Sequence, residues 1–522
     1  MVKALPKRRN IWSCSSRVAS IALTVAILGT SEAGVVHADA PGHGILNPVP
    51  RLQDLSAGPP LTGLQKQTLR SIAKRTWSFF SADVNPTTDL PMDNIGLDGA
   101  PAQGPYTSPT DIAMYLWSIV AATQMRIVTP PQGEQLAAKA LNAIQDLQKW
   151  NGFLLSWYST NSGKAINGPG QGPITSLNGQ FISTVDNGWY ASSLIVVRNA
   201  FPALYQQASK LFSAMNFGVF YDQGNESTNI NAGQMYGGYY VGKGPAGFEY
   251  GNLNTDPRIA AYIGIGSHNL PGDVWWRTWR ALPASFTWQT QVPQGPTVTY
   301  TDPYSHKQFS VAETHYTYQG ISYVPSWGGS EFEALMAPLV VPEAAWGQTN
   351  FGLNDINYAE ASIQYETKSL KYPVWGLSPA STPDKTGGYD AYGALPLGSA
   401  GPSNAYAQSA VTPYASFLAL PFLPQQAFTN IQKLQSLYPI YGPYGFFDSV
   451  NPATGTVGTR YLVLDQAMIL AGIDDALNHG GLQRYYAVDP VAQAMKPYLS
   501  ITKFSITPAP DLQLNNASSG EH

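Results

Sequence analysis

The sequence predicts an all-α fold, an (α/α)6 toroid of alternating inner and outer helices with a small β-hairpin insertion. Three observations lead to this prediction. Eleven segments repeat apolar residues at three- and four-residue steps, several of these segments are apolar on every face, and the others have one apolar side. Helices that are apolar on every face must be buried on all sides, and one-sided helices can cover them. About six helix pairs closed into a ring account for both kinds.

The helical segments follow one another along the chain, between long loops rich in Gly, Pro and Asn. The stretches 191–197 and 411–420 are apolar nearly all round and are expected inside, whereas 134–150 is amphipathic and is expected outside. Thr110, directly after Pro109, is expected to cap its helix. The eleven segments are 64–80, 110–120, 134–150, 188–199, 202–215, 258–265, 330–340, 354–370, 413–420, 424–437 and 464–478.

Residues 285–325 depart from the helical period. They are rich in Thr, Val, Tyr and Trp, and polar and apolar residues alternate at 297–300 and 309–311. The segment 302–307 between these two runs is typical of a turn, so a hairpin insertion is predicted here.

The N-terminal residues 1–38 are expected to form a signal peptide. Four basic residues between Lys3 and Arg9 precede an eleven-residue, mostly apolar stretch at 18–28, and Val36 and Ala38 fit the small residues of a cleavage site. The apolar stretch is shorter than the roughly 20 residues that span a bilayer, which makes a retained anchor the weaker interpretation. Residues 39–62 are expected to be a flexible leader, 63–505 one catalytic domain, and 506–522 a disordered tail. Export to a periplasm or to the medium follows.

Composition excludes several classes of function. Cleavage after residue 38 leaves 24 basic and 32 acidic residues, a net charge of −8, without a cluster of Lys or Arg for a phosphate backbone. Nucleic acid is therefore not an expected partner, and neither is a membrane once the signal is removed. The single cysteine, Cys14, lies in the signal peptide, so the mature chain has no thiol chemistry. Phosphate-loop, serine-elbow and zinc-helix motifs are missing, and no cofactor or metal is expected.

Charged residues make up only 12% of the chain, so acids inside apolar or aromatic segments draw attention. A buried carboxyl has a raised pKa and can donate a proton near neutral pH. Cleavage of a glycosidic bond needs one protonated carboxyl and one ionised carboxylate, and flat aromatic faces can hold sugar rings. Acids next to Trp- and Tyr-rich loops therefore indicate glycoside hydrolysis. The candidate catalytic acids are Asp186, Asp256, Glu333, Asp448 and Asp465.

Four of the five acids also have a purely structural interpretation. Asp186 and Asp256 are placed to cap helices, Glu333 to interact with a helix dipole, and Asp465 to pair with an arginine. Caps can still face a pocket, because helix N-termini ring one mouth of such a toroid. The candidate substrate-binding residues are Trp189, Glu249, Arg258, Trp276, Trp327, Trp375 and Tyr444, and Glu313 and Glu331 are further acids of lower rank.

Seven segments in order resemble the bacterial glucoamylase-like family, which includes endo-β-1,2-glucanases and related exopolysaccharide-associated proteins. They lie at 107–112, 183–188, 254–258, 326–333, 374–378, 444–449 and 464–466, and the resemblance covers about residues 105–480. It implies an (α/α)6 toroid, secretion and a carboxylate-lined cleft that hydrolyses glucan, with inversion of the anomeric carbon. Asp256 departs from family members that carry Glu at its position.

The sequence therefore predicts an exported, endo-acting and inverting glycoside hydrolase for a bacterial polysaccharide or glucan. Asp256 or Glu333 would be the general acid, Asp448 or Asp465 the base, and Asp186 would orient the substrate or share the proton. One alternative is a polysaccharide lyase that uses His315, Tyr316 or Tyr318 as its base. Another is a non-catalytic glycan-binding protein of exopolysaccharide assembly.

Overall fold

The computed structural model describes residues 44–52, 55–97, 101–384, 386–510 and 512–515. The predicted signal peptide, 1–38, lies outside these residues. None of the helices in the described ranges is long and apolar enough to cross a bilayer.

All eleven predicted segments contain helix. They correspond to α1 (Gly63–Asp83), α2 (Pro109–Gln124), α3 (Pro130–Asp146), α4 (Thr184–Ala200), α5 (Tyr205–Ser213), α6 (Arg258–Gly266), α8 (Glu331–Leu335), α10 (Phe351–Gln364), α11 (Pro413–Ala419), α12 (Pro424–Leu437) and α13 (Val463–Asn478). Four helices were not predicted individually: α7 (Asp273–Arg277), α9 (Glu343–Trp346), α14 (Gly481–Ala487) and α15 (Pro490–Ile501).

Local hydrogen bonds explain where several helices begin. Ser108, rather than the predicted Thr110, caps α2: its hydroxyl accepts from the Asp111 N–H and the Asp111 carboxyl accepts from the Ser108 N–H, with Pro109 at the first position. The helix predicted to reach residue 150 ends at Asp146, because Lys149–Trp150 pairs as a strand with Phe153–Leu154. The helical spacing of apolar residues does not predict where such a strand ends the helix.

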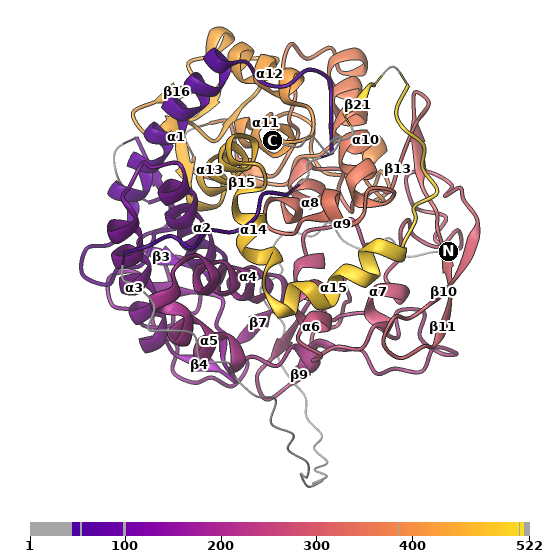
Figure 1. Cartoon of the computed structure of the whole chain (residues 1–522), viewed down its shortest axis with the longest axis horizontal. Helices are drawn as coiled ribbons and strands as arrows, with labels where there is room; N and C mark the ends of the chain where they lie inside the picture. The colour runs from indigo at the N-terminus through magenta and orange to yellow at the C-terminus, as the bar shows by residue number, and fades with distance from the viewer. Residues whose placement is uncertain (1–43, 53–54, 98–100, 385, 511, 516–522) are drawn as a thin grey trace, which may run out of the picture. The chain divides into compact units, whose positions relative to one another are not determined.

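The most buried helices pack against one another largely in chain order. α2 packs on α4 and α4 on α6, while α10 and α8 pack on α11, α11 packs on α13, and α13 returns to α2. Five helices with one exposed side cover them: α1 on α13, α3 on α2, α5 on α4, α12 on α11 and α15 on α6. Figure 1 shows α2, α4, α11 and α13 nearer the middle, with α1, α3 and α12 further out. One continuous apolar core joins nearly all of these elements.

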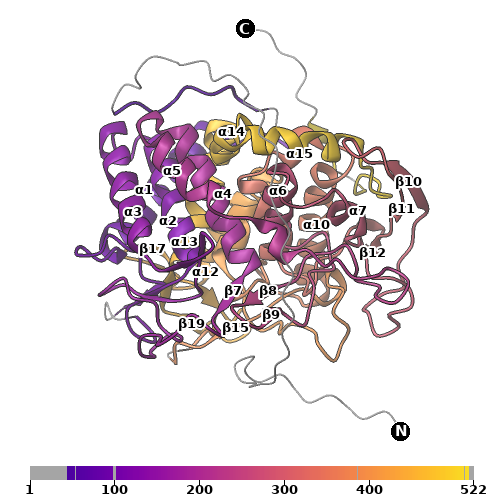
Figure 2. The same cartoon turned by 90° about the horizontal axis from the view of Figure 1, so that it is seen from below.

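The expectation of an all-α protein needs one amendment. Many loops contain short strand pairs, one sheet has three strands, and several of them lie together below the helices in Figure 2. The pairs are β1 (Ser56–Ala57) with β21 (Leu514–Asn515), β2 (Asn94–Gly96) with β20 (Arg460–Leu462), β3 (Tyr106–Thr107) with β6 (Tyr158–Ser159), β4 (Lys149–Trp150) with β5 (Phe153–Leu154), β14 (Ala380–Ser381) with β15 (Tyr389–Asp390), β16 (Tyr441–Gly442) with β17 (Gly445–Phe446) and β18 (Ser449–Val450) with β19 (Val457–Gly458), and β7 (Phe181–Ser183), β8 (Gly238–Tyr240) and β9 (Gly244–Pro245) form the larger sheet.

The predicted hairpin insertion is present. β10 (Thr297–Thr301) pairs antiparallel with β11 (Gln308–Ala312), and a second hairpin joins β12 (Tyr316–Tyr318) to β13 (Ile321–Tyr323). The segments expected to be a flexible leader and a disordered tail meet in the β1–β21 pair, where Ala57 is buried. Backbone hydrogen bonds between two distant segments are not visible in local composition.

Candidate active site

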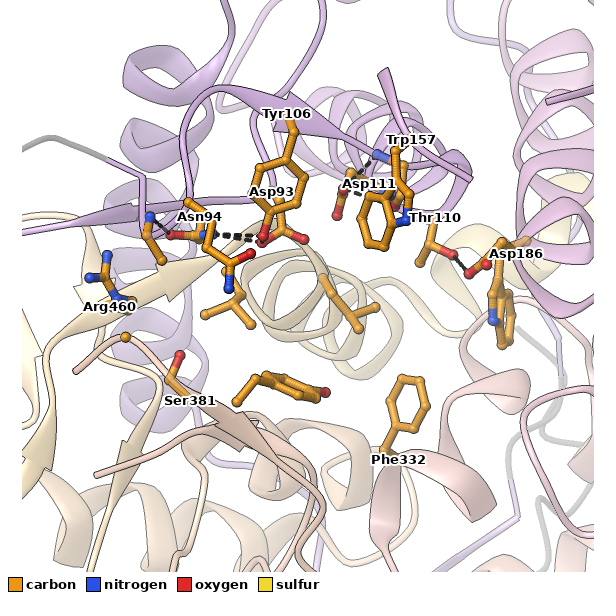
Figure 3. A pocket seen from close by; sticks show the side chains of 18 of the residues that line it. Asp93, Asn94, Tyr106, Thr110, Asp111, Trp157, Asp186, Phe332, Ser381 and Arg460 are labelled. Atoms are coloured by element: carbon orange, nitrogen blue, oxygen red, sulfur yellow. Dashed lines mark hydrogen bonds between the residues drawn. The ribbon is translucent and has the colours of Figure 1, made fainter. Parts of the chain in front are cut away.

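A cavity of about 430 Å³ opens among the N-terminal ends of α2, α4, α6 and α8 and the loops beside them. Figure 3 shows its side chains gathered from strand, loop and helix segments that are far apart in the sequence. Its lining contains four carboxyl groups, five aromatic rings and one arginine: Asp93, Asp111, Asp186, Asp256, Tyr106, Trp157, Trp189, Phe332, Tyr389 and Arg460. The cavity is therefore strongly acidic and has flat apolar surfaces.

Asp256 presents its carboxyl to the cavity directly before α6 begins. Burial raises the pKa of Asp256 well above its usual range, and the neighbouring negative charges of Glu333 and Asp186 raise it further. It does not cap α6 with its side chain, since Pro257 is the N-cap of that helix and no side-chain hydrogen bond caps it. These surroundings favour the protonated form of Asp256, which is the form that can donate a proton.

Glu333 lies behind this acid and is fully occupied by hydrogen bonds. Its carboxyl accepts from the Ser326 hydroxyl at 2.7 Å, the Gly328 N–H at 2.8 Å and the Tyr406 hydroxyl at 3.1 Å. The Ser330 N–H donates at 3.4 Å, which completes a capping box at the start of α8. Burial raises the pKa of Glu333 and these bonds lower it. A carboxyl surrounded by donors acts as an acceptor, so Glu333 is an anchored anion beside Asp256.

Asp186 lies in the cavity wall in the first turn of α4, where the helix dipole favours a negative charge. Its carboxylate accepts a 2.6 Å hydrogen bond from the Thr110 hydroxyl of α2. The cap of α4 is Ser183, whose hydroxyl accepts from the Asp186 N–H, so Asp186 is not the cap that the sequence suggested. Figure 3 shows the Thr110–Asp186 contact at one end of the cavity.

Asp93 and Asp111 line the cavity and were not among the predicted site residues. Oδ2 of Asp93 accepts 2.7 Å hydrogen bonds from the Asn94 amide and the Tyr106 hydroxyl (Figure 3). Burial raises the pKa of Asp93, and the charge of Asp448 also raises it. Asp111 belongs to the capping box of α2, and such a motif can be recognised in a sequence. Asp93 lies in a loop, where no periodic pattern of residues points to it.

Asp448 and Asp465 form a buried pair next to the cavity wall. Neither lines the cavity; Ser381, whose N–H donates to Asp448, and Leu464 lie on its surface. Burial and the charge of Asp448 raise the pKa of Asp465 well above its usual range. Burial also raises the pKa of Asp448. The surroundings therefore favour the neutral form of Asp465 over its charged form.

Of the seven predicted substrate-binding residues, only Trp189 lines the cavity. Arg258 is buried in an ion pair with Glu343, at 2.8 Å, and Trp276 is buried against Tyr300 with its indole N–H on Asp302. Glu249 accepts from Asn231, Trp375 is buried, and Tyr444 packs on Phe79 and Tyr461. Trp327 is 37% exposed outside the cavity lining. The aromatic lining instead comes from Tyr106, Trp157, Phe332 and Tyr389.

The candidate lyase bases also lie elsewhere. His315 contacts the Ser505 hydroxyl, Tyr316 donates to Gln289, and Tyr318 contacts Ser369; none of the three belongs to the cavity lining. Within the described residues, no group of three or more His, Cys, Asp or Glu side chains is arranged to hold a metal ion. The chemistry available at the cavity is that of carboxyl groups.

Two family models match the chain in succession. A model described as "Protein of unknown function" matches residues 71–240, and the Glycoamylase model, described as "Putative glucoamylase", matches residues 257–490. A cyclic β-(1,2)-glucan synthase of Rhizobium meliloti is 29% identical over 132 residues, which are 25% of this chain. That match spans only 4% of the length of the synthase.

Solved structures share the fold. An endo-β-1,2-glucanase from Chitinophaga pinensis, bound to sophorotriose and glucose, aligns with a TM-score of 0.62 and 16% identity over 83% of this chain and 98% of that chain. The endo-β-1,2-glucanase of Talaromyces funiculosus, bound to sophorose, aligns with a TM-score of 0.60 and 12% identity over 83% and 88%. The resemblance that the sequence shows to the bacterial glucoamylase-like family is confirmed. Residues 257–490 are the part of the chain that the Glycoamylase family model matches.

Proposed function

We propose that this protein is a glycoside hydrolase that cleaves a neutral β-linked glucan within the chain and inverts the anomeric carbon. The observation that carries the proposal is a cavity in which a protonated carboxyl, Asp256, and a hydrogen-bonded carboxylate, Asp93, line the same space. An acid and a base on one bound sugar are what the reaction requires. The endo-β-1,2-glucanases that share the fold suggest β-1,2-glucan as the first substrate to test.

Asp256 is the proposed general acid. It donates its proton to the glycosidic oxygen as the bond to the anomeric carbon breaks, and the neighbouring charge of Glu333 keeps that proton on Asp256 until it is needed. Asp186, next to Asp256, would orient the sugar ring through its free oxygen while Thr110 holds the other.

Asp93 is the proposed base. It accepts a proton from water while the water oxygen attacks the anomeric carbon from the other side of the ring. The hydrogen bonds from Asn94 and Tyr106 hold one carboxylate oxygen. The sequence-based expectation that Asp448 or Asp465 is the base stays a prediction. In the arrangement proposed here, this pair lies behind Asp93 and its negative charge increases the basicity of Asp93.

The charge of the lining supports a neutral substrate. Arg460 is the one basic side chain among the described residues that line the cavity, so a uronate or phosphorylated sugar would find little positive charge to neutralise it. This arrangement disfavours the lyase alternative, since elimination requires groups that neutralise a uronate carboxylate. Trp157, Phe332 and Tyr389 offer faces against which uncharged sugar rings can pack.

The remaining expectations are part of the same proposal. The return of α13 to α2 supports an (α/α)6 toroid. The signal at residues 1–38 supports export, and the site then meets an extracellular or periplasmic polysaccharide.

The test is a reducing-end and product-mass assay of residues 39–522 on linear β-1,2-glucan, beside β-1,3- and β-1,4-glucans and a polyuronate. We expect new reducing ends at whole-sugar masses from a neutral glucan, and loss of activity by about 10³-fold in Asp256→Asn. Products lighter by one water would identify a lyase. Binding without any product would identify the non-catalytic glycan-binding alternative.

A further inference from the structure

Four aromatic side chains outside the cavity form a continuous strip. Trp279 contacts Phe286 at 5.5 Å between ring centroids, Phe286 stacks on Trp288 at 5.7 Å, and Trp288 meets Trp327 edge to face at 6.0 Å. Trp288 is 44% exposed and Trp327 is 37% exposed. Neighbouring exposed aromatic rings on a globular protein mark a binding surface more often than an isolated exposed ring does. We call these four residues the aromatic strip.

The aromatic strip is attached to two segments of the proposed site, the one that leads to Asp256 and the one that leads to Glu333. The Trp279 N–H donates to the Gly251 carbonyl and the Leu253 N–H to the Trp279 carbonyl, three residues before Asp256. Trp327 directly precedes Gly328, whose N–H donates to Glu333. The strip therefore begins beside the Asp256 end of the cavity.

The loop that carries Phe286 and Trp288 is held in place by side-chain hydrogen bonds. Gln289 donates to the Pro283 carbonyl and accepts from the Tyr316 hydroxyl, and Thr290 donates to the Ala400 carbonyl. Rings held in this way lose little freedom when a ligand arrives.

The segments around the exposed rings of the strip contain no charged residue. Residues 281–301 and 316–330, which carry Phe286, Trp288 and Trp327, contain no Asp, Glu, Lys or Arg, and neither do residues 391–412, in which the Ala400 N–H donates to the Trp327 carbonyl. Arg280, the nearest basic residue in sequence to Trp279, is buried in an ion pair with Glu313. Anionic polymers and anionic membranes are recognised by Lys and Arg, which this surface lacks. Uncharged sugar rings, with an apolar face and hydroxyl edges, suit exposed indoles beside Ser, Thr and Gln.

We propose that the aromatic strip binds sugar units of the same neutral glucan chain that occupies the cavity, several units away from the bond that is cleaved. This inference rests on the proposed function, and it predicts that the enzyme prefers long chains. A chain threaded from the cavity past Asp256 reaches Trp327 and then Trp288. A short oligosaccharide fills the cavity alone and gains nothing from the strip.

The test compares Trp288→Ala with wild type on linear β-1,2-glucan and on its trisaccharide. We expect kcat/KM on the polymer to fall about tenfold in Trp288→Ala, mainly through KM, and to stay within twofold of wild type on the trisaccharide. Trp288→Phe, which keeps an aromatic face, should recover most of the loss. Tyr205→Ala is the matched control, because Tyr205 is 43% exposed on α5 and belongs to neither surface. Thermal unfolding of all variants checks that the fold is kept.

A second measurement separates the strip from catalysis. Migration of the Asp256→Asn and Asp256→Asn/Trp288→Ala chains in a gel containing β-1,2-glucan reports binding without turnover. Weaker retardation of the double variant supports the strip, even if wild type proves to have no hydrolase activity. Equal retardation of both, no retardation of either, or an equal loss of activity on polymer and trisaccharide overturns it. A wild-type dimer that Trp288→Ala dissociates in light scattering would assign the surface to self-association and also overturn it.

Discussion

Glu333 accepts hydrogen bonds from Ser326, Gly328 and Tyr406 and lies beside Asp256, whose pKa is raised by burial and then by the charge of Glu333. The sequence left the general acid open between Asp256 and Glu333, and the structure gives the two residues different surroundings. Asp256 lines the cavity, and burial together with the charge of Glu333 raises its pKa. These surroundings favour the protonated form of the short Asp256 side chain.

Glu333→Gln tests this relationship. Glutamine keeps an acceptor oxygen for the cap of α8 and removes the negative charge. The raised pKa of Asp256 should then fall, and since the acid works only while protonated, the alkaline limb of the kcat/KM profile should move to lower pH. The measurement is a pH–rate profile on β-1,2-glucan. Glu226→Gln, a surface variant at an exposed ion pair with Arg277, is the control. An unmoved alkaline limb in Glu333→Gln contradicts the assignment.

Asp93→Asn tests the base. We expect a loss of about 10³-fold or more in kcat with the fold intact, because the attacking water then loses its proposed proton acceptor. In wild type the raised pKa of Asp93 means that activity is lost as the pH falls through a value above that of an ordinary Asp. Full activity of Asp93→Asn would return the base role to Asp448.

The Asp448–Asp465 pair predicts an asymmetry between two variants. Asp465→Asn keeps the charge of Asp448 near Asp93, and the neutral amide replaces a carboxyl whose neutral form is already favoured, so activity should fall by about tenfold or less. In Asp448→Asn the charge near Asp93 is removed, and the acid limb should move to lower pH with a larger loss of kcat. Steady-state kinetics of the two purified variants decide it; equal effects, or the reverse order, would contradict the proposed effect of the Asp448 charge on Asp93.

Arg258 is expected to determine stability more than binding. Its guanidinium bonds both oxygens of Glu343 and the carbonyls of Thr255, Glu333 and Ala334, all buried. Arg258→Met leaves the charge of Glu343 unpaired and should cost about 3–5 kcal/mol of unfolding free energy. The measurement is urea unfolding followed by circular dichroism. Arg258→Met/Glu343→Gln, which removes both charges, should recover part of the loss; a single variant as stable as wild type would restore a binding role.

Glu331 and Glu366 predict a pH-dependent stability. The Ser362 hydroxyl lies 2.5 Å from one carboxyl and 3.0 Å from the other, and its single proton can serve only one of them, so one carboxyl must be protonated. Burial raises the pKa of Glu331 to about 7. The folded state therefore binds more protons than the unfolded state between the ordinary Glu pKa and about 7, and stability falls as the pH rises through that range.

Glu331→Gln should weaken this dependence, although burial also raises the pKa of Glu366, which the variant keeps. The variant should match wild type in urea midpoint near pH 5 and exceed it at pH 8, by at most about 3 kcal/mol. Ser362→Ala, which removes the bridging hydroxyl and keeps both carboxyls, is the companion variant and should be less stable than wild type at pH 8. Parallel pH profiles for wild type and Glu331→Gln would contradict the shared proton.

The sequence by itself determined the helices and the kind of chemistry. Apolar spacing located all eleven predicted helical segments, because that spacing reports the face a helix buries, and the scarcity of charge drew attention to Asp186 and Asp256, which both line the cavity. Four short or C-terminal helices were missed individually, and Asp93 was missed because a loop position carries no period. The three-dimensional fold decided the rest.

Which acid faces the cavity, which is anchored and which shares a proton depend on neighbours distant in sequence. Arg258 meets Glu343, 85 positions away, and Glu333 meets Tyr406, 73 positions away. Burial, hydrogen bonds and nearby charges set the protonation of a carboxyl, and these exist only once the chain has folded. For that reason the sequence indicated carboxylate chemistry, and only the tertiary structure could distribute its roles among the carboxyls.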